Sequence, residues 1–197
     1  MVAQLLVVLG VLVFGLQHSG LSALRVKEKV IDRWGKIGYA RLFNGTSILA
    51  LVVAFFSMNF WDWLYFVTEP EMIQPVLLLS GVVLIALGLV VSAKASQAIS
   101  VSTVADMRTD RKPELVTDGV YSRIRHPLYL ATILLLLGMA AVYPFTNVLV
   151  FALSLGGYVL VGAWLEERKL VRQYGQEYQE YRKKAGFMLP GLRRRGR

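Results

Sequence analysis

The segment from residue 114 to residue 130 gathers ionisable and aromatic side chains between two long apolar blocks. Asp118-Gly119 is a turn signal, and Pro127 suits the first turn of a helix, because its missing N–H would have no partner there. The polar groups therefore lie at the mouth of a helix that enters apolar surroundings. Their density is more typical of a ligand site than of an ordinary connecting loop, and they comprise Glu114, Asp118, Tyr121, Arg123, Arg125, His126 and Tyr129.

A pair of acids, Glu166 and Glu167, follows the last long apolar block. The two apolar blocks before it are joined by the short turn 143–147, so we expect antiparallel helices that return the acids to the side of the polar segment. Paired carboxylates at the end of a membrane helix are costly unless they meet cations or a charged ligand. Two interpretations stay open: a charged ligand, or ion pairs with Arg123, Arg125 or Arg168.

The elements that must position these residues are long apolar helices. Of the 197 residues, 55% are hydrophobic, and a membrane-spanning helix needs about 20 apolar residues. The sequence therefore predicts an all-α integral membrane protein of about five transmembrane helices, with helices 1–3 and basic linkers in residues 1–112 and a ligand-binding region in residues 113–197. The predicted spans are residues 2–23, 43–61, 75–93, 127–143 and 146–165. Gly81 and Gly88 in the third span predict close packing against a neighbouring helix.

The basic residues fall on one side of this arrangement. Segments 24–42, 94–126 and 166–197 hold 6, 6 and 10 of the Lys and Arg residues, which is all 22. The positive-inside rule then places the N-terminus outside and the C-terminus in the cytoplasm. We therefore expect a protein of the cell inner membrane whose site faces the cytoplasm.

The net charge of +9 is accounted for by this topology and by affinity for anionic membrane lipids, so nucleic acid is not an expected partner.

The absence of cysteine excludes thiolate chemistry and Cys-type metal sites, and two histidines do not make a His-rich centre, so no metal is expected. The first apolar block has no preceding Lys or Arg, which is the reverse of a signal peptide's charge order, and we interpret it as a retained helix.

Beyond the acid pair, residues 169–184 have helical periodicity. Leu170, Tyr174, Tyr178 and Tyr181 fall near one face, with charged residues elsewhere. This pattern predicts a C-terminal amphipathic helix on the cytoplasmic side, lying on the membrane or packing over the mouth of the helices.

Three features together resemble the isoprenylcysteine carboxyl methyltransferase family, of which phospholipid methyltransferases are more distant relatives. They are Gly-x-Tyr-x-x-x-Arg-His-Pro-x-Tyr at residues 119–129, the paired acids after the hairpin, and Tyr-Gly-x-x-Tyr-x-x-Tyr at residues 174–181. The resemblance covers residues 113–190 and implies a membrane methyltransferase that uses S-adenosylmethionine. It implies cofactor contacts from Glu114, Leu115, Val116, Tyr121, His126, Pro127, Leu128, Tyr129 and Glu166.

The charges of this cofactor match the residue types. Arg125 or His126 suits its carboxylate and Glu166 its ammonium, while Tyr121 or Tyr129 suits the adenine ring or the sulfonium. No Gly-x-Gly-x-x-Gly motif follows a strand pattern, so a Rossmann-type methyltransferase is excluded.

The methyl acceptor is expected to be lipophilic or a small thiol. In the family that the chain resembles, an arginine four residues before the first acid is associated with the substrate carboxylate, and here that position is Gly162. Arg123, Arg125 or Arg168 could replace the missing guanidinium. A thiol acceptor needs a base instead, for which His18 and Glu167 are candidates. The predicted catalytic residues are therefore Glu167, Arg125 and His18.

Alternatives of other classes share part of this pattern. Gln17-His18-Ser19 and the basic linker are loosely similar to membrane thiol methyltransferases and to accessory proteins of nitric-oxide metabolism. Membrane sterol reductases share Arg-His-Pro-x-Tyr but use a reduced nicotinamide cofactor, and they are longer. A non-catalytic accessory protein that keeps the fold is the third possibility.

Overall fold

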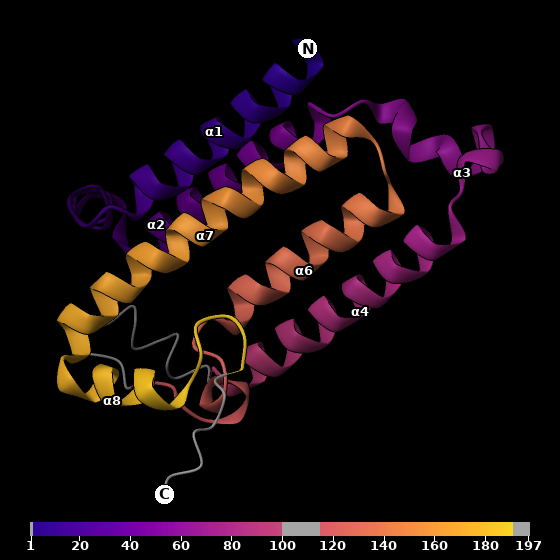
Figure 1. Ribbon diagram of the computed structural model, residues 1–197. Coiled ribbons are helices and arrows are strands. Elements are labelled where there is room, and N and C mark those ends of the chain that lie inside the picture. Colours follow the sequence, from indigo (N-terminus) through magenta and orange to yellow (C-terminus); the bar gives the residue numbers. More distant parts are fainter. Residues whose placement is uncertain (1, 100–114, 191–197) are drawn as a thin grey trace, which may run out of the picture. The chain divides into compact units, whose positions relative to one another are not determined.

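The computed structural model describes residues 2–99 and 115–190. These residues are almost entirely helical (Figure 1), and within them the only β-type pairing is the isolated parallel bridge between Ile124 and Gly186. The chain divides into two compact units, Met1–Leu78 with Ala140–Leu155 and Leu79–Met139 with Gly156–Arg197.

Four helices in the described residues are long and apolar enough to cross a membrane: α1 (Val2–Ser22), α2 (Leu24–Phe56), α4 (Pro75–Ala98) and α7 (Thr146–Tyr174). The remaining predicted span corresponds to α6 (Pro127–Val142), which is apolar but has only 16 residues. At about 1.5 Å per residue it is about 24 Å long, shorter than a hydrocarbon core of about 30 Å. The all-helical prediction is confirmed, and four of the five predicted spans reach membrane-spanning length.

In the first unit, α1 packs directly against α2. A Cβ added to Gly10 would lie 3.0 Å from the Cα of Ala54, so the two backbones approach closely here. Val7 and Ala54 are fully buried. Two polar bridges join the same helices: Gln17 Nε2 donates to Thr46 Oγ1 (2.7 Å), and His18 Nδ1 lies 3.1 Å from Ser47 Oγ.

Two boundaries in this unit differ from the prediction. Residues 24–42 were predicted as a linker, but they are helical within α2, which is interrupted at Gly35 (φ +71°). The many charged residues of this segment suggested a linker. An exposed helix, however, tolerates charge on most of its surface. The second predicted span ends early, at Phe56, and the short helices η1 (Phe60–Leu64), α3 (Tyr65–Thr68) and η2 (Pro70–Met72) follow it.

In the second unit, glycines let α4 and α6 pack closely. A Cβ on Gly88 would lie 3.0 Å from Leu135 Cγ and 3.1 Å from the carbonyl oxygen of Ala131. A Cβ on Gly138 would lie 2.8 Å from the carbonyl oxygen of Gly81. The predicted packing role of Gly81 and Gly88 is therefore confirmed.

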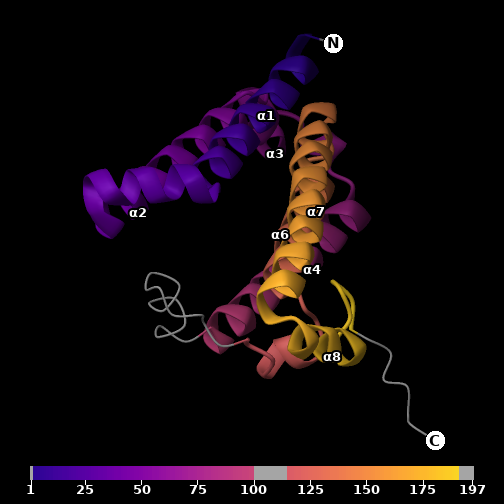
Figure 2. The same cartoon turned by 90° about the vertical axis from the view of Figure 1, so that its left-hand side faces the viewer.

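The predicted single helix over residues 169–184 is wrong in one respect. The chain continues α7 to Tyr174, turns at Gly175, and begins a separate helix, α8 (Gln176–Lys184). Gly175 has φ +59° and ψ −124°, a conformation open to glycine and strained for other residues. Figures 1 and 2 both show α8 turned away from the axis of α7. Whether α8 lies on a membrane surface stays a prediction.

Candidate active site

The polar segment ahead of α6 is fixed by backbone pairing with the chain after α8. The N–H of Arg125 donates to the carbonyl of Gly186 (2.8 Å) and that of His126 to the carbonyl of Phe187 (3.0 Å). In return, the N–H of Gly186 donates to the carbonyl of Arg123 (2.9 Å). A short 3₁₀ helix, η3 (Gly119–Ser122), precedes this pairing. The segment that follows α8 thus fixes the backbone of Arg125 and His126.

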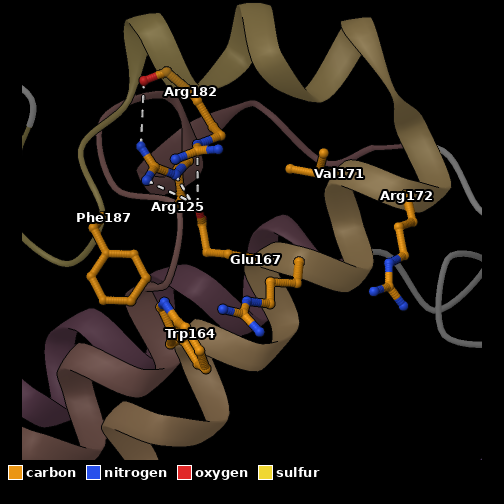
Figure 3. Close-up of a pocket in the computed structure, with 8 residues that line it drawn as sticks. Arg125, Trp164, Glu167, Val171, Arg172, Arg182 and Phe187 are labelled. Carbon is orange, nitrogen blue, oxygen red and sulfur yellow. Dashed lines mark hydrogen bonds and ion pairs between the residues drawn. The ribbon is translucent and has the colours of Figure 1, made fainter.

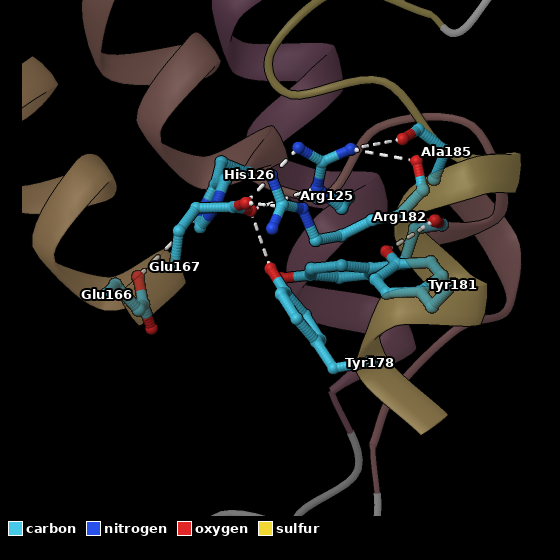
Figure 4. Close-up of polar contacts among 9 residues, drawn as sticks. Arg125, His126, Glu166, Glu167, Tyr178, Tyr181, Arg182 and Ala185 are labelled. Carbon is cyan, nitrogen blue, oxygen red and sulfur yellow. Dashed lines mark hydrogen bonds and ion pairs between the residues drawn. The ribbon is translucent and has the colours of Figure 1, made fainter. Parts of the chain in front are cut away.

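Glu167 is the centre of a buried polar network (Figure 4). Its Oε1 accepts hydrogen bonds from Arg125 Nε (2.9 Å), His126 Nε2 (2.9 Å) and Tyr178 OH (2.6 Å). Its Oε2 lies 3.2 Å from Arg182 Nε. Since the side chain is only 10% exposed, two guanidinium groups and a hydroxyl replace the water that would otherwise solvate the charge.

Arg125 is fully engaged in this network. Its Nη2 donates to Glu167 Oε2 (3.3 Å), while Nη1 donates to the carbonyls of Ala185 and Arg182. Each of its three guanidinium nitrogens therefore has a partner, and the side chain is 9% exposed. Of the two interpretations of the acid pair, ion pairing applies to Glu167, with Arg125 and Arg182 as its partners.

Two tyrosines of α8 anchor this helix to the site. Tyr178 is 1% exposed, and burial together with its hydrogen bond to Glu167 raises the pKa of its hydroxyl. Tyr181 OH donates to the carbonyl of Tyr121 (2.7 Å). These two tyrosines form an apolar cluster with Ala185, Leu115, Leu170, Val171 and Tyr174.

A cavity of about 360 Å³ lies beside this network, and we call it the Glu166 cavity. Its volume falls in the range of small-molecule sites, about 300–1,000 Å³. Its walls are mostly apolar and aromatic. The lining residues are Ile99, Leu115, Val116, Tyr121, Arg125, His126, Pro127, Leu128, Tyr129, Glu166, Leu170, Tyr174, Tyr178 and Tyr181.

Glu166 places an unpaired acceptor in this cavity. Its Oε2 is buried and accepts no hydrogen bond from the described residues, although the whole side chain is 39% exposed. His126 Nδ1 lies 3.7 Å from this oxygen and is a cationic partner only when both ring nitrogens are protonated. His126 Nε2 must carry a proton because its partner, the Glu167 carboxylate, only accepts, so Nδ1 is the nitrogen left for a ligand. Burial and the charge of Glu166 raise the pKa of Tyr121 to about 12, so its hydroxyl stays protonated and able to donate.

The structure brings most of the predicted site residues together. Of the nine predicted cofactor contacts, Glu114 lies outside the described residues, and the other eight line the Glu166 cavity. Arg125 lines the same cavity, whereas Glu167 lies in the network behind it. His18 belongs to the first unit, where its ring contacts Ser47, Phe14 and Phe43.

Residues of the C-terminal part were missed as site residues. Tyr178 and Arg182 reach Glu167 from α8, and Leu170 and Tyr174 line the cavity from α7. The tyrosine spacing after residue 170 was a usable signal, because it places three aromatic side chains near one helical face. Arg182 carried no signal of its own, since it sits in a run of basic residues.

Residues 76–177 match the phospholipid methyltransferase family, and the chain belongs to this family. It is 30% identical to a methanethiol S-methyltransferase of Pseudomonas deceptionensis, over 98% of this chain and 74% of that protein. A methanethiol S-methyltransferase of Crocosphaera subtropica is 26% identical over 96% of this chain and 76% of that protein. A protein-S-isoprenylcysteine O-methyltransferase of Schizosaccharomyces pombe is 32% identical over 50% of this chain and 42% of that protein. No solved structure matches the chain. The prediction of a membrane methyltransferase is confirmed.

Proposed function

We propose that this protein uses S-adenosylmethionine to methylate the sulfur of a small or lipophilic thiol, with its site on the cytoplasmic side of the inner membrane. The observation that carries the proposal is the buried, unpaired Oε2 of Glu166 in a cavity with aromatic and apolar walls. One oxygen of this carboxylate is shielded from water and lacks a hydrogen bond, although the side chain is 39% exposed. An ammonium group would supply the missing donor. The orphaned acceptor and the walls of the cavity therefore fit this cofactor.

Each part of the cofactor would be bound by residues of matching chemistry. Glu166 would hold the ammonium, and His126 in its doubly protonated form would donate from Nδ1 to the carboxylate. Leu115 and Val116 would cover the adenine, with Tyr121 and Tyr129 available for the ring or the sulfonium. S-adenosylmethionine supplies a methyl group on a positively charged sulfur, which a nucleophile attacks directly. The main requirement on the protein is alignment of that nucleophile with the methyl group.

The hydrogen bonds that Arg125 already makes favour a thiol over a carboxylate as the methyl acceptor. Arg125 is the only arginine that lines the Glu166 cavity within the described residues, and its guanidinium is occupied by Glu167 and two carbonyls. A carboxylate acceptor would find no free guanidinium among these lining residues. Two relatives that match nearly the whole chain are named for a thiol substrate, which supports the same choice.

The base that would take the thiol proton is proposed to be His18. Glu167 is a weak base in this geometry, because two arginines, His126 and Tyr178 already stabilise its charge. We therefore assign Glu167 and Arg125 a positioning role. His18 Nδ1 lies 3.1 Å from Ser47 Oγ, and Nε2 can accept a proton in the tautomer whose Nδ1–H donates to that hydroxyl.

A direct competition between acceptors tests the proposal. The purified protein, with labelled S-adenosylmethionine, would receive a small alkane thiol or a farnesylated cysteine derivative, and kcat/KM would be compared. We expect the thiol to be favoured by at least about tenfold, equivalent to about 1.4 kcal/mol. A preference for the farnesylated carboxylate would overturn the thiol assignment. In that case Arg123→Gln or Arg168→Gln should raise its KM.

The cofactor assignment has its own control. S-adenosylhomocysteine should raise the melting temperature of the protein in detergent, and NADPH should not. If only NADPH raised the melting temperature, the protein would be interpreted as a reductase. If neither ligand changed it, the protein would be interpreted as an accessory protein.

A further inference from the structure

A second cavity, of about 650 Å³, lies on another face of α7 and is not used by the proposed reaction. We call it the arginine cavity (Figure 3). It is lined by Arg125, Trp164, Glu167, Arg168, Val171, Arg172, Arg182 and Phe187. Trp164, Arg168 and Arg172 recur at intervals of four residues, so they share one face of the helix. Glu166, Leu170 and Tyr174 share the face that lines the Glu166 cavity.

The arginine cavity has a large uncompensated positive charge. Four arginines line it against a single glutamate, and Glu167 is already shared by Arg125 and Arg182. No described carboxylate forms an ion pair with Arg168 or Arg172. Arg182 uses only Nε on Glu167, and its terminal nitrogens make no hydrogen bond to a described residue. Arg168 and Arg172 are exposed and the Arg182 side chain is 48% exposed, so an anion can reach all three, and it would supply the counter-charge that they lack.

The geometry of the free groups suits a phosphate. Guanidinium groups present paired N–H donors that match two oxygens of one phosphate. Arg168 stacks on Trp164, with its guanidinium carbon 3.6 Å from the ring centroid, which holds the side chain in place while its edge stays free. Figure 3 shows Arg182 and Arg125 reaching toward Glu167, with Arg172 further along α7.

The position of the cavity along α7 indicates that the phosphate belongs to a lipid. The apolar part of α7 ends at Leu165, where polar residues begin, and Trp164 is typical of a membrane interface. Leu160 and Trp164 lie on the same face as Arg168, and Leu160, Val161 and Leu165 are each about half exposed. Acyl chains would lie along this apolar surface, below a headgroup in the cavity.

We propose that the arginine cavity binds the phosphate of an anionic phospholipid. Basic pockets beside membrane helices on the cytoplasmic side bind such headgroups. A lipid such as phosphatidylglycerol has no thiol, amine or carboxylate, so it is a bound ligand and not a methyl acceptor. The proposal does not depend on the acceptor or on the cofactor.

Lipid binding by the full chain tests this site. The delipidated protein in neutral detergent would be titrated with phosphatidylglycerol or with phosphatidylcholine of the same acyl chains, and bound lipid would be counted by native mass spectrometry. We expect phosphatidylglycerol to bind at least about tenfold more tightly. Arg168→Gln/Arg172→Gln should weaken it about tenfold, the scale of one lost hydrogen bond to a charged group.

The matched control is Lys169→Gln/Lys184→Gln, which removes the same charge from α7 and α8 at residues that do not line the cavity. It should change the affinity by less than about threefold, since screened surface charge contributes little. If the double arginine variant loses its helical circular dichroism, the exposed residue Arg172 can be changed alone. Equal binding of the two lipids, or equal losses in variant and control, would overturn the site. Full displacement by millimolar inorganic phosphate would assign it to a soluble ligand instead.

Discussion

Glu166 and Glu167 are consecutive on α7, yet their carboxylates have opposite surroundings. Oε1 of Glu167 accepts hydrogen bonds from three side chains, whereas Oε2 of Glu166 is buried and accepts none from the described residues. Consecutive helical residues point about 100° apart, so one acid enters the structural network and its neighbour enters the cavity. The two acids should therefore separate ligand binding from stability.

Glu166→Gln should weaken binding of S-adenosylhomocysteine by at least about 1.5 kcal/mol, the scale of a lost hydrogen bond to a charged group. The change keeps the shape of the side chain and removes the charge that would meet the ammonium. Isothermal titration calorimetry measures the effect, with the exposed Glu177→Gln on α8 as the matched control. Unchanged affinity would leave Glu166 without a role in the cofactor site.

Glu167→Gln should instead lower the free energy of unfolding by about 3 kcal/mol. The substitution leaves the buried guanidinium of Arg125 without a counter-charge, and breaking one side of a buried ion pair is strongly destabilising. Denaturation in detergent, compared with Glu166→Gln, measures the difference. A loss no larger than that of Glu166→Gln would argue against a supporting network around Glu167.

Stability should fall in alkaline solution. Burial raises the pKa of Tyr121 to about 12 and raises that of Tyr178 as well, while an unfolded tyrosine titrates near 10. Above pH about 10 the folded state holds protons that the unfolded state loses, so this stability is complete below pH 10 and is lost as pH rises through the folded values.

Tyr178→Phe should flatten this decline by about 1.4 kcal/mol per pH unit, the slope due to one proton. It should also cost about 1.5 kcal/mol at neutral pH, because the hydrogen bond to Glu167 is lost. Melting temperatures of both proteins from pH 8 to 11.5 provide the comparison. Parallel curves would mean that Tyr178 does not carry the alkaline transition.

Gly175→Ala should destabilise the second unit by about 1–3 kcal/mol, since φ +59° with ψ −124° strains any residue with a Cβ. The altered turn would also draw Tyr178 and Arg182 away from Glu167. Gly157→Ala is the control, because Gly157 lies inside α7 and an added Cβ meets nothing within 4 Å. That change should be neutral or slightly stabilising. Equal melting temperatures would show that the turn is unimportant.

The one-sided basic residues predict the orientation in the membrane. Reporter fusions at Trp63 and Tyr143 should be extracytoplasmic, and a fusion at Lys36 should be cytoplasmic, because Lys and Arg are retained on the cytoplasmic side. Paired alkaline phosphatase and green fluorescent protein reporters measure this. A cytoplasmic signal at Trp63 would overturn the predicted topology.

The sequence predicted the long helices because an apolar run needs no knowledge of its neighbours. It also located the cavity wall from Leu115 to Tyr129, where unusual residue types stand together. It missed the break at Gly175, since the periodicity of the tyrosines continues across the turn. It missed Arg182 as a partner of Glu167, because an arginine among basic residues gives no indication of which acid it meets.

The backbone pairing of Arg125 and His126 with Gly186 and Phe187 sets an order of events during synthesis. Arg125 leaves the ribosome some sixty residues before Ala185, whose carbonyl it later contacts. Both α6 and α7 are made in that interval. Synthesis of this helical hairpin must therefore be complete before the network around Glu167 can close. Until α8 follows, the nascent chain has both helices of the hairpin but lacks Tyr178, Arg182 and the Ala185 carbonyl, which complete the site.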